Sequence, residues 1–186
     1  MLIGLTGRIA SGKGQIVEYL EKKGFEYYTI SKVVREEAAK INIPITRESL
    51  QDVGNLIRRY EGSGGWIKRL IQRLDLSKNN IIDGIRNPGE IEELGKMKDF
   101  FLISVDCPQK IRFERVVSRN KASDAKTWET FLEMDERDFG IGESAEGQQV
   151  GKCMALADFH LTNNSSLEDF HEKIDEIYAK ISQISP

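Results

Sequence analysis

Short apolar runs alternate with longer amphipathic segments along the whole chain. Each run combines β-branched, aromatic and aliphatic residues over a few positions, which is typical of strands buried in a parallel sheet. We therefore predict five strands, at residues 2–6, 25–30, 81–84, 100–108 and 157–162.

The segments between these runs carry signals that start helices. Ser31 and Thr46 are expected N-caps, and Pro88 suits the first turn of a helix. Ser165 and Glu168 have the spacing of a capping box and predict a C-terminal helix. Strands alternating with helices indicate an α/β fold, a three-layer sandwich with a five-stranded parallel sheet. The segment 141–151 reads as a loop.

Composition narrows the function classes. The chain has 186 residues and a net charge of −3, so it offers no global basic field and nucleic-acid binding is not expected. Its two cysteines lack the spacing of a zinc site, which fits a reducing compartment. No apolar run is long enough to span a membrane, and no signal peptide begins the chain, so we expect a cytoplasmic protein.

The sequence TGRIASGKGQ follows the first predicted strand and leads into a helix. It matches the phosphate-binding motif G-x-x-x-x-G-K-[ST] except at its last position, where Gly14 replaces the hydroxyl that holds Mg²⁺. Backbone N–H groups of such a loop converge on an anion, and Lys13 adds a point charge for the β- and γ-phosphates. The residues expected to bind ATP here are Gly7, Arg8, Ile9, Ala10, Ser11, Gly12, Lys13, Gly14 and Gln15.

The third predicted strand ends in the sequence IIDGIR. Asp83 is an acid at the end of a buried strand, where a carboxylate can hold Mg²⁺ through its water shell. An ordinary Asp-Gly turn is the alternative reading. Arg86 would lie at the same edge of the sheet, which is where ligands bind in open α/β folds.

Arginines gather in two further regions. Arg115 and Arg119 share one face of a predicted helix and Arg137 follows, so that guanidinium groups are available to neutralise charge during phosphoryl transfer. A solvated basic face is the alternative, and we expect it for Arg112. Its acidic partners would be Glu114, Glu133 and Asp138.

The second region lies between the second and third strands. Arg35, Arg58 and Arg59 stand on two predicted helices that could bind an anionic acceptor. Because Arg58 and Arg59 are adjacent, they point in different directions, and at most one of them faces a ligand.

Together these motifs resemble the P-loop nucleoside-monophosphate kinases, the adenylate-kinase type and the related dephospho-CoA kinases. ASGKG resembles their phosphate loop, and IIDGIR resembles their strand-end DGFPR without its proline. The resemblance implies Asp83 for the metal shell, and Arg86 and Arg35 for the acceptor phosphate. Lys32 stands where small kinases related to dephospho-CoA kinase carry an acid.

The resemblance continues into the second half of the chain. ERVVSR resembles the helix that leads into the lid, which implies phosphate contacts for Arg115 and Arg119, and Arg137 resembles the arginine after the lid. LADFHLTNN resembles the last strand and the loop near the adenine, which implies a nucleotide contact for Asn163.

The fold and function that follow are those of a nucleotide kinase. We expect one P-loop kinase domain over residues 1–186, with an acceptor-binding helical insert at about 31–75 and a short lid at about 120–127. We expect an enzyme that uses ATP and Mg²⁺ to phosphorylate a small phosphorylated acceptor, either a nucleoside or deoxynucleoside monophosphate. Dephospho-CoA kinase activity is an alternative. A nucleotide-sensing module, which binds ATP or GTP, hydrolyses it slowly and passes a conformational change to a partner, is an alternative of another class.

Overall fold

The computed structural model describes residues 1–120 and 124–185. Within these residues five strands form one parallel sheet with the order β2-β3-β1-β4-β5. The strands are β1 (Leu2–Gly7), β2 (Glu26–Thr29), β3 (Asn80–Asp83), β4 (Phe100–Asp106) and β5 (Phe159–Thr162). The α/β class and the five-stranded parallel sheet predicted from the sequence are confirmed.

Helices connect successive strands, as parallel strands require. In the described part of the chain they are α1 (Lys13–Lys22), α2 (Ile30–Lys40), α3 (Arg47–Glu61), α4 (Gly65–Ile71), α5 (Pro88–Leu94), α6 (Gln109–Arg119), α7 (Trp128–Phe139), α8 (Val150–Ala155) and α9 (Leu167–Ile184).

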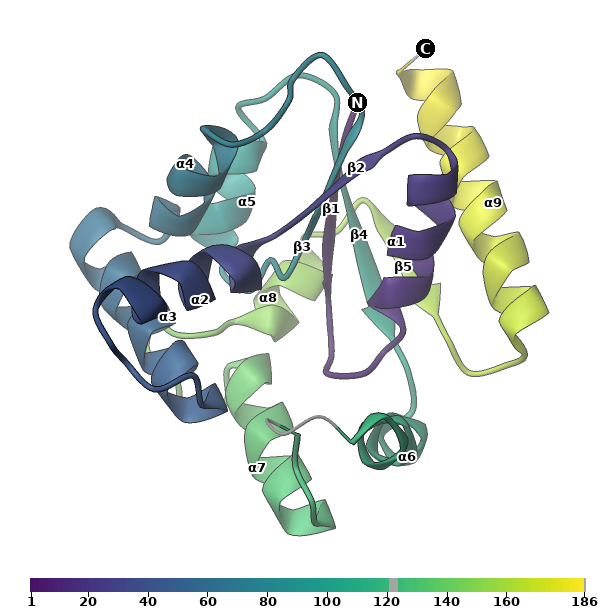
Figure 1. Ribbon diagram of the computed structural model, residues 1–186. Helices are drawn as coiled ribbons and strands as arrows, with labels where there is room; N and C mark the ends of the chain where they lie inside the picture. Colours follow the sequence, from purple (N-terminus) through teal and green to yellow (C-terminus); the bar gives the residue numbers. More distant parts are fainter. Residues whose placement is uncertain (121–123, 186) are drawn as a thin grey trace.

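The two faces of the sheet bury separate apolar clusters, which makes the fold a three-layer sandwich (Figure 1). On one face, α1 and α9 pack over the sheet around Ile16, Leu20 and Phe170. On the other, helices α2 to α5 and α8 surround Trp66 and Ile82. Burying both faces explains why the central strands read as continuous apolar runs.

Helix starts differ from the sequence prediction at two places. Thr29, not Ser31, caps α2, because the Thr29 side chain accepts a hydrogen bond from the Ser31 N–H. Ser166, not Ser165, caps α9, and its partner is the N–H of Asp169. Thr46 caps α3 as predicted. Both errors are shifts of one or two residues, because neighbouring Ser and Thr side chains offer equivalent cap oxygens.

The segment 141–151 is less loop-like than predicted, because the short helix α8 begins at Val150. Its sequence VGKCMA is too short to show helical periodicity, and Cys153 secures it by packing in the core.

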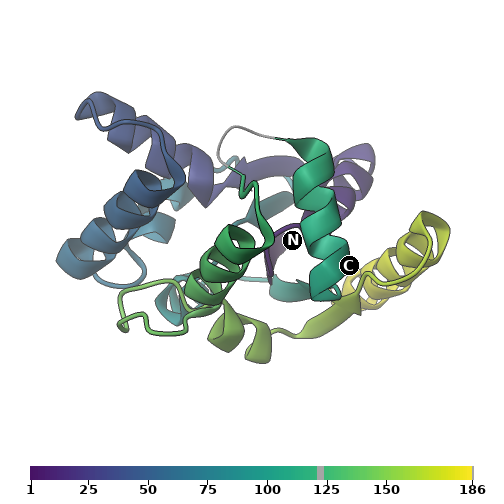
Figure 2. The same cartoon turned by 90° about the horizontal axis from the view of Figure 1, so that it is seen from below.

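The carboxyl ends of the strands meet at one edge, and α6 and α7 lie beyond that edge (Figures 1 and 2). This is the edge at which open parallel sheets bind ligands. The lid expected at about 120–127 falls partly on residues 121–123, which lie outside the described residues. In the described part of the chain, none of the helices combines the length and the apolar character needed to cross a membrane.

Candidate functional site

The loop between β1 and α1 has the backbone of a phosphate cradle. Gly7, Ala10 and Gly12 have φ values of 140°, 57° and 109°, so the chain turns repeatedly toward conformations that favour glycine. A Cβ at Gly7 would collide with the carbonyl of Val105, and one at Gly12 with the amide of Asn163. A left-handed alanine is unusual and strained, and such strain gathers at functional sites. The loop conformation is therefore tied to these glycines.

Lys13 lies folded over the start of its own loop. Its Nζ donates to the carbonyl oxygens of Gly7 at 2.9 Å and Arg8 at 3.0 Å, so two of its three N–H donors are engaged within the loop. Burial lowers the pKa of Lys13 from its ordinary value of 10.5. The nearby carboxylate of Asp83 acts in the opposite direction and raises that pKa.

Asp83 and Gly14 define the space beside Lys13. The Oδ1 atom of Asp83 is buried and has no hydrogen-bond partner among the described residues. A Cβ added at Gly14 would meet no atom within 4 Å outside its own helix backbone and chain neighbours. Within the described ranges, no three His, Cys, Asp or Glu side chains gather as a metal site. A cation here would take a single carboxylate, which suits the water-rich coordination of Mg²⁺.

Helix α6 and the end of β5 hold the outer side of the loop. Arg115 donates to the carbonyl oxygens of Ala10 at 3.4 Å and Ser11 at 3.3 Å, and to Asn163 Oδ1 at 3.1 Å. Asn163 Nδ2 in turn donates to Ser11 at 3.0 Å. An open hollow of about 540 Å³ begins here, lined by Gly12, Gln15, Arg115, Asn163, Ser165 and Leu167. Gly12, Gln15 and Asn163, which the sequence predicts to bind the nucleotide, therefore line the same hollow.

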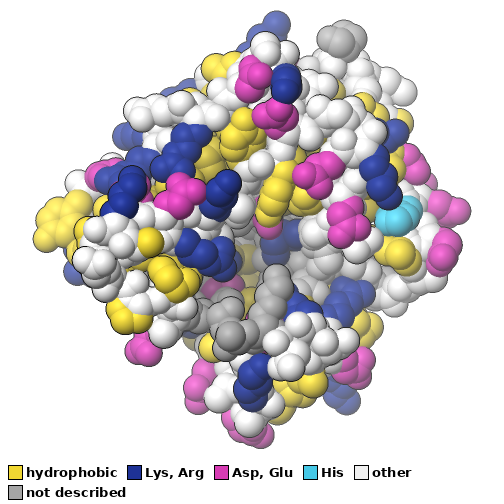
Figure 3. Space-filling view, viewed as in Figure 1, with side chains coloured by type: hydrophobic (Ala, Val, Ile, Leu, Met, Phe, Trp, Pro, Cys, Tyr) yellow, Lys and Arg dark blue, Asp and Glu magenta, His cyan; other side chains and the backbone are white. Residues whose placement is uncertain are grey.

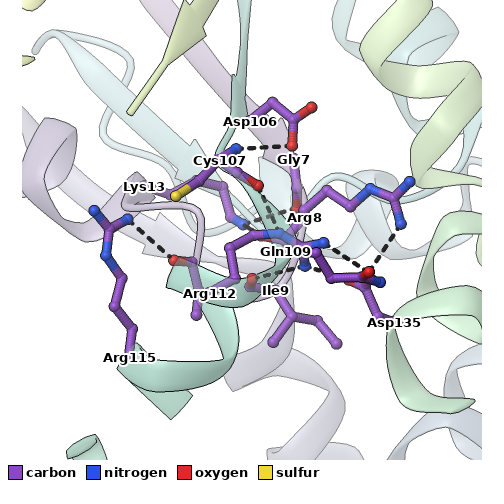
Figure 4. A network of polar contacts seen from close by, with 11 residues as sticks. Gly7, Arg8, Ile9, Lys13, Asp106, Cys107, Gln109, Arg112, Arg115 and Asp135 are labelled. Atoms are coloured by element: carbon purple, nitrogen blue, oxygen red, sulfur yellow. Dashed lines mark hydrogen bonds and ion pairs between the residues drawn. The ribbon is translucent and has the colours of Figure 1, made fainter. Parts of the chain in front are cut away.

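Arg112 is not part of a solvated basic face, and that prediction is wrong. Its side chain is 3% exposed, and it donates to both carboxylate oxygens of Asp135 at 2.5 and 2.8 Å (Figure 4). Asp135, on α7, is fully buried and also accepts from Arg8 of the phosphate loop at 3.0 Å. The Arg8 guanidinium lies 3.7 Å from the ring centroid of Phe139. These contacts fix α6 and α7 against the loop, because an unpaired charge at this depth is costly.

Two arginines assigned to the lid are paired with acids. Arg119, at the end of α6, makes a bidentate pair with Asp124 at 2.7 Å for both bonds. Arg137 donates to Glu143 at 2.8 Å and to Asp52 of α3 at 3.2 Å. The structure does not bring Arg137 into the hollow beside Arg115; it places this side chain between α7 and α3.

A separate cavity lies on the acceptor side of the loop, enclosed by α2, α3 and the segment after β3. The three arginines predicted for the acceptor, Arg35, Arg58 and Arg86, all line it, and its volume is about 600 Å³ with its open mouth included. Lys and Arg side chains gather around the hollow at the centre of the face in Figure 3. Arg59 is exposed, as its adjacency to Arg58 required.

Arg58 also forms a buried ion pair that the sequence did not predict. Its side chain is 4% exposed and pairs with the fully buried Glu90 at 2.9 Å. Glu90 also accepts from the backbone N–H groups of Arg86 at 2.7 Å and Asn87 at 3.1 Å. The ion pair thus fixes both a cavity wall on α3 and the turn that carries Arg86.

Sequence reasoning missed Glu90, Asp135 and Gln148 as residues of this region. For Asp135 a signal was present, because Phe131, Asp135 and Asp138 recur at helical spacing and all prove to be buried. Two acids on the apolar face of an amphipathic helix call for buried basic partners. Glu90 and Gln148 show no such signal.

The sheet order, the phosphate loop and the flanking arginines define a P-loop NTPase of the kinase-like class. Residues 3–139 match a family model described as an AAA domain. The chain is 31% identical over 191 residues to the UPF0200 protein PH1008 of Pyrococcus horikoshii, with 97% of each chain covered. The chain belongs to the UPF0200 family.

Solved structures share the fold at low identity. A shikimate kinase from Aquifex aeolicus is 17% identical with a TM-score of 0.56, covering 100% of this chain and 98% of that one. A dephospho-CoA kinase from Campylobacter jejuni is 14% identical with a TM-score of 0.51, covering 97% and 96%. The resemblance to kinases seen in the sequence motifs therefore extends to the fold.

Proposed function

We propose that this protein is an ATP-dependent kinase that phosphorylates a nucleoside or deoxynucleoside monophosphate. The observation that carries the proposal is the cavity that Arg35, Arg58 and Arg86 line. A phosphate loop alone would serve any nucleotide-binding protein. A second cavity lined by guanidinium groups supports a second anionic substrate, since planar guanidinium groups match phosphate oxygens.

The donor nucleotide would occupy the loop and the hollow beside Arg115 and Asn163. Lys13 would exchange its two carbonyl partners for phosphate oxygens, which are stronger acceptors because they are charged. The hollow lined by Gln15 and Asn163 would receive the base and sugar of ATP.

Asp83 fits the role of an outer ligand of Mg²⁺. Its buried Oδ1, which has no hydrogen-bond partner in the described part of the chain, would accept hydrogen bonds from metal-bound water. When bound, Mg²⁺ would supply charge neutralisation for the transferred group. Gly14 offers no side-chain oxygen, so the loop contributes no direct ligand at that position.

The acceptor phosphate would be held by Arg35 and Arg86, with Arg58 fixing the wall behind them. One of its oxygens, already anionic at neutral pH, attacks the γ-phosphorus of ATP. A new P–O bond forms while the bond from the γ-phosphorus to the bridging oxygen breaks, which gives ADP and a diphosphate product. No base is needed, so the protein acts by positioning and charge neutralisation.

The remaining arginines would act through closure. In this proposal residues 31–75 form the acceptor-binding insert and residues 120–127 the lid within one kinase domain. Arg115 would keep its contacts with the phosphate loop. Arg119 and Arg137 would leave their carboxylate partners and contact the transferring phosphate. This closure would exclude water from the site. The free buried thiols support a cytoplasmic location.

A coupled assay of ADP release tests the proposal. We expect ATP turnover to rise at least tenfold over the basal rate with one or more of the common nucleoside monophosphates, and Arg86→Ala to abolish that rise. Dephospho-CoA is assayed beside them as the alternative acceptor. If ATP binds but no acceptor stimulates turnover, and Arg86→Ala changes neither activity nor ligand binding, the kinase proposal is overturned and a sensor is favoured.

A further inference from the structure

Among residues 1–120 and 124–185, one buried polar atom on the lining of the acceptor cavity has no hydrogen-bond partner. Gln148 lines the cavity and is 3% exposed, and its Oε1 atom is shielded from solvent. Among the residues whose positions are described, none donates a hydrogen bond to that oxygen. Buried side-chain carbonyl oxygens are nearly always paired, so this exception, on a residue that lines a cavity, calls for a donor that the described residues do not supply, such as a ligand.

The position of Gln148 is fixed by its neighbours on both sides. The backbone N–H of Gln149 donates to the carbonyl of Arg86 at 2.6 Å. The side chain of Asn87 donates to the carbonyl oxygens of Ala145 at 2.8 Å and Gly147 at 2.9 Å. The segment before α8 is thus joined to the turn that carries Arg86, and Gln148 is held against the arginine-lined wall.

An amide oxygen recognises hydrogen-bond donors of a ligand, whereas a guanidinium group recognises hydrogen-bond acceptors. Arg35 and Arg86 donate hydrogen bonds and suit phosphate oxygens, whereas Oε1 of Gln148 only accepts. Phosphate oxygens are acceptors too, so Gln148 requires a different part of the ligand, one that carries an N–H or O–H group. Ile30 and Val34 line the same cavity and offer apolar contact to a flat ring.

We propose that Gln148 is a specificity-determining residue that accepts a hydrogen bond from the nucleoside part of the acceptor. The donor is either an N–H group of the base or a hydroxyl of the sugar. The inference rests on the proposed kinase function and deepens it, because it makes a nucleoside, and not only a phosphate, the feature that the cavity recognises.

The test compares acceptor preference in the wild-type protein, Gln148→Leu and the matched control Gln149→Leu. The Gln149 amide bonds the carbonyl of Ser144 at 2.8 Å and does not line the cavity, so its loss perturbs the same segment without removing the cavity oxygen. Acceptors are AMP, CMP, GMP and UMP, their 2′-deoxy forms, and a purine nucleotide without the 6-amino group. The readouts are kcat and KM from ADP release and the equilibrium Kd of each acceptor.

We expect Gln148→Leu to lower kcat/KM for the preferred acceptor about tenfold or more, mainly through KM, as one lost hydrogen bond to a buried group predicts. The ratio of kcat/KM between the best and the poorest acceptor falls in Gln148→Leu and stays at the wild-type value in Gln149→Leu. If the donor is a base N–H, preference among bases narrows. If it is a sugar hydroxyl, the ribose preference narrows instead.

Three outcomes overturn the inference. Gln148→Leu could keep the wild-type preferences, or Gln149→Leu could lose them equally, which would assign the effect to the loop. In both cases the inference fails, but the proposed kinase function is still supported if the wild-type protein phosphorylates a nucleoside monophosphate. If the wild-type protein neither phosphorylates nor binds any monophosphate, the proposed function and the inference fall together. Binding without turnover still ranks the acceptors by Kd and decides for or against Gln148.

Discussion

Asp135→Asn removes one negative charge from the buried ion cluster of Arg8, Arg112 and Asp135. The carboxylate is fully buried and receives Arg112 and Arg8, whose side chains are 3% and 22% exposed. Removing one partner of a buried pair costs about 3–5 kcal/mol, because the remaining charge is left without compensation. Of the roughly 5–15 kcal/mol by which a domain is stable, this is a large fraction.

The assay is urea unfolding followed by circular dichroism. The free energy of unfolding falls by about 2 kcal/mol per molar urea, so the unfolding midpoint of Asp135→Asn lies about 1.5–2.5 M below that of the wild type. Asp52→Asn is the matched control, since Asp52 pairs with Arg137 at the surface with 65% of its side chain exposed and costs at most about 1 kcal/mol. A loss in Asp135→Asn no larger than that of Asp52→Asn would refute the assignment of this cluster as a structural clamp.

Three further predictions follow from the same structure. Gly14→Ser leaves the urea midpoint unchanged or slightly raised, because a Cβ meets open space in the first turn of α1; Gly7→Ala, measured in parallel, lowers it, because its Cβ meets a carbonyl at φ 140°. Burial lowers the pKa of Lys13, so the unfolded chain holds that proton more tightly, and the contribution of Lys13 to the free energy of unfolding rises with pH between the lowered pKa and 10.5. Lys13→Met removes this rise in urea titrations across that range, and an unchanged slope would contradict it. Burial raises the pKa of Cys107 and of Cys153, so neither thiol reacts with a thiol reagent until the chain unfolds. Rapid labelling of the folded protein would show that these side chains are accessible.

The parts of the site that lie next to strand ends could be predicted from the sequence. Gly7 and Lys13 stand in a local motif between a strand and a helix, and Asp83 and Arg86 follow another apolar run. Parallel strands bring their carboxyl ends to one edge, so these residues meet whatever the details of packing. Local pattern and topology were sufficient for this part of the site.

The partners that fix the site could not be predicted in this way. Asp135 meets Arg8 across 127 positions, and Arg58 meets Glu90 across 32. Which acid a buried arginine finds depends on how helices pack, and their periodicity alone does not specify that packing. Gln148 depends in addition on a segment with no regular structure before α8, where residue type and spacing carry little information about direction.

The support behind the phosphate loop has a consequence for how the protein is made. Gly7 fits against the backbone of Val105 in β4, and Gly12 fits against Asn163 just after β5, so the loop is held by residues that come much later in the chain. Ribosomes add about 5–20 residues per second and release the N-terminal part first. The loop is among the first segments to emerge but acquires its bracing only when β5 follows. A nascent chain that ends before Asn163 lacks this contact, so the loop acquires its full support only near the end of synthesis.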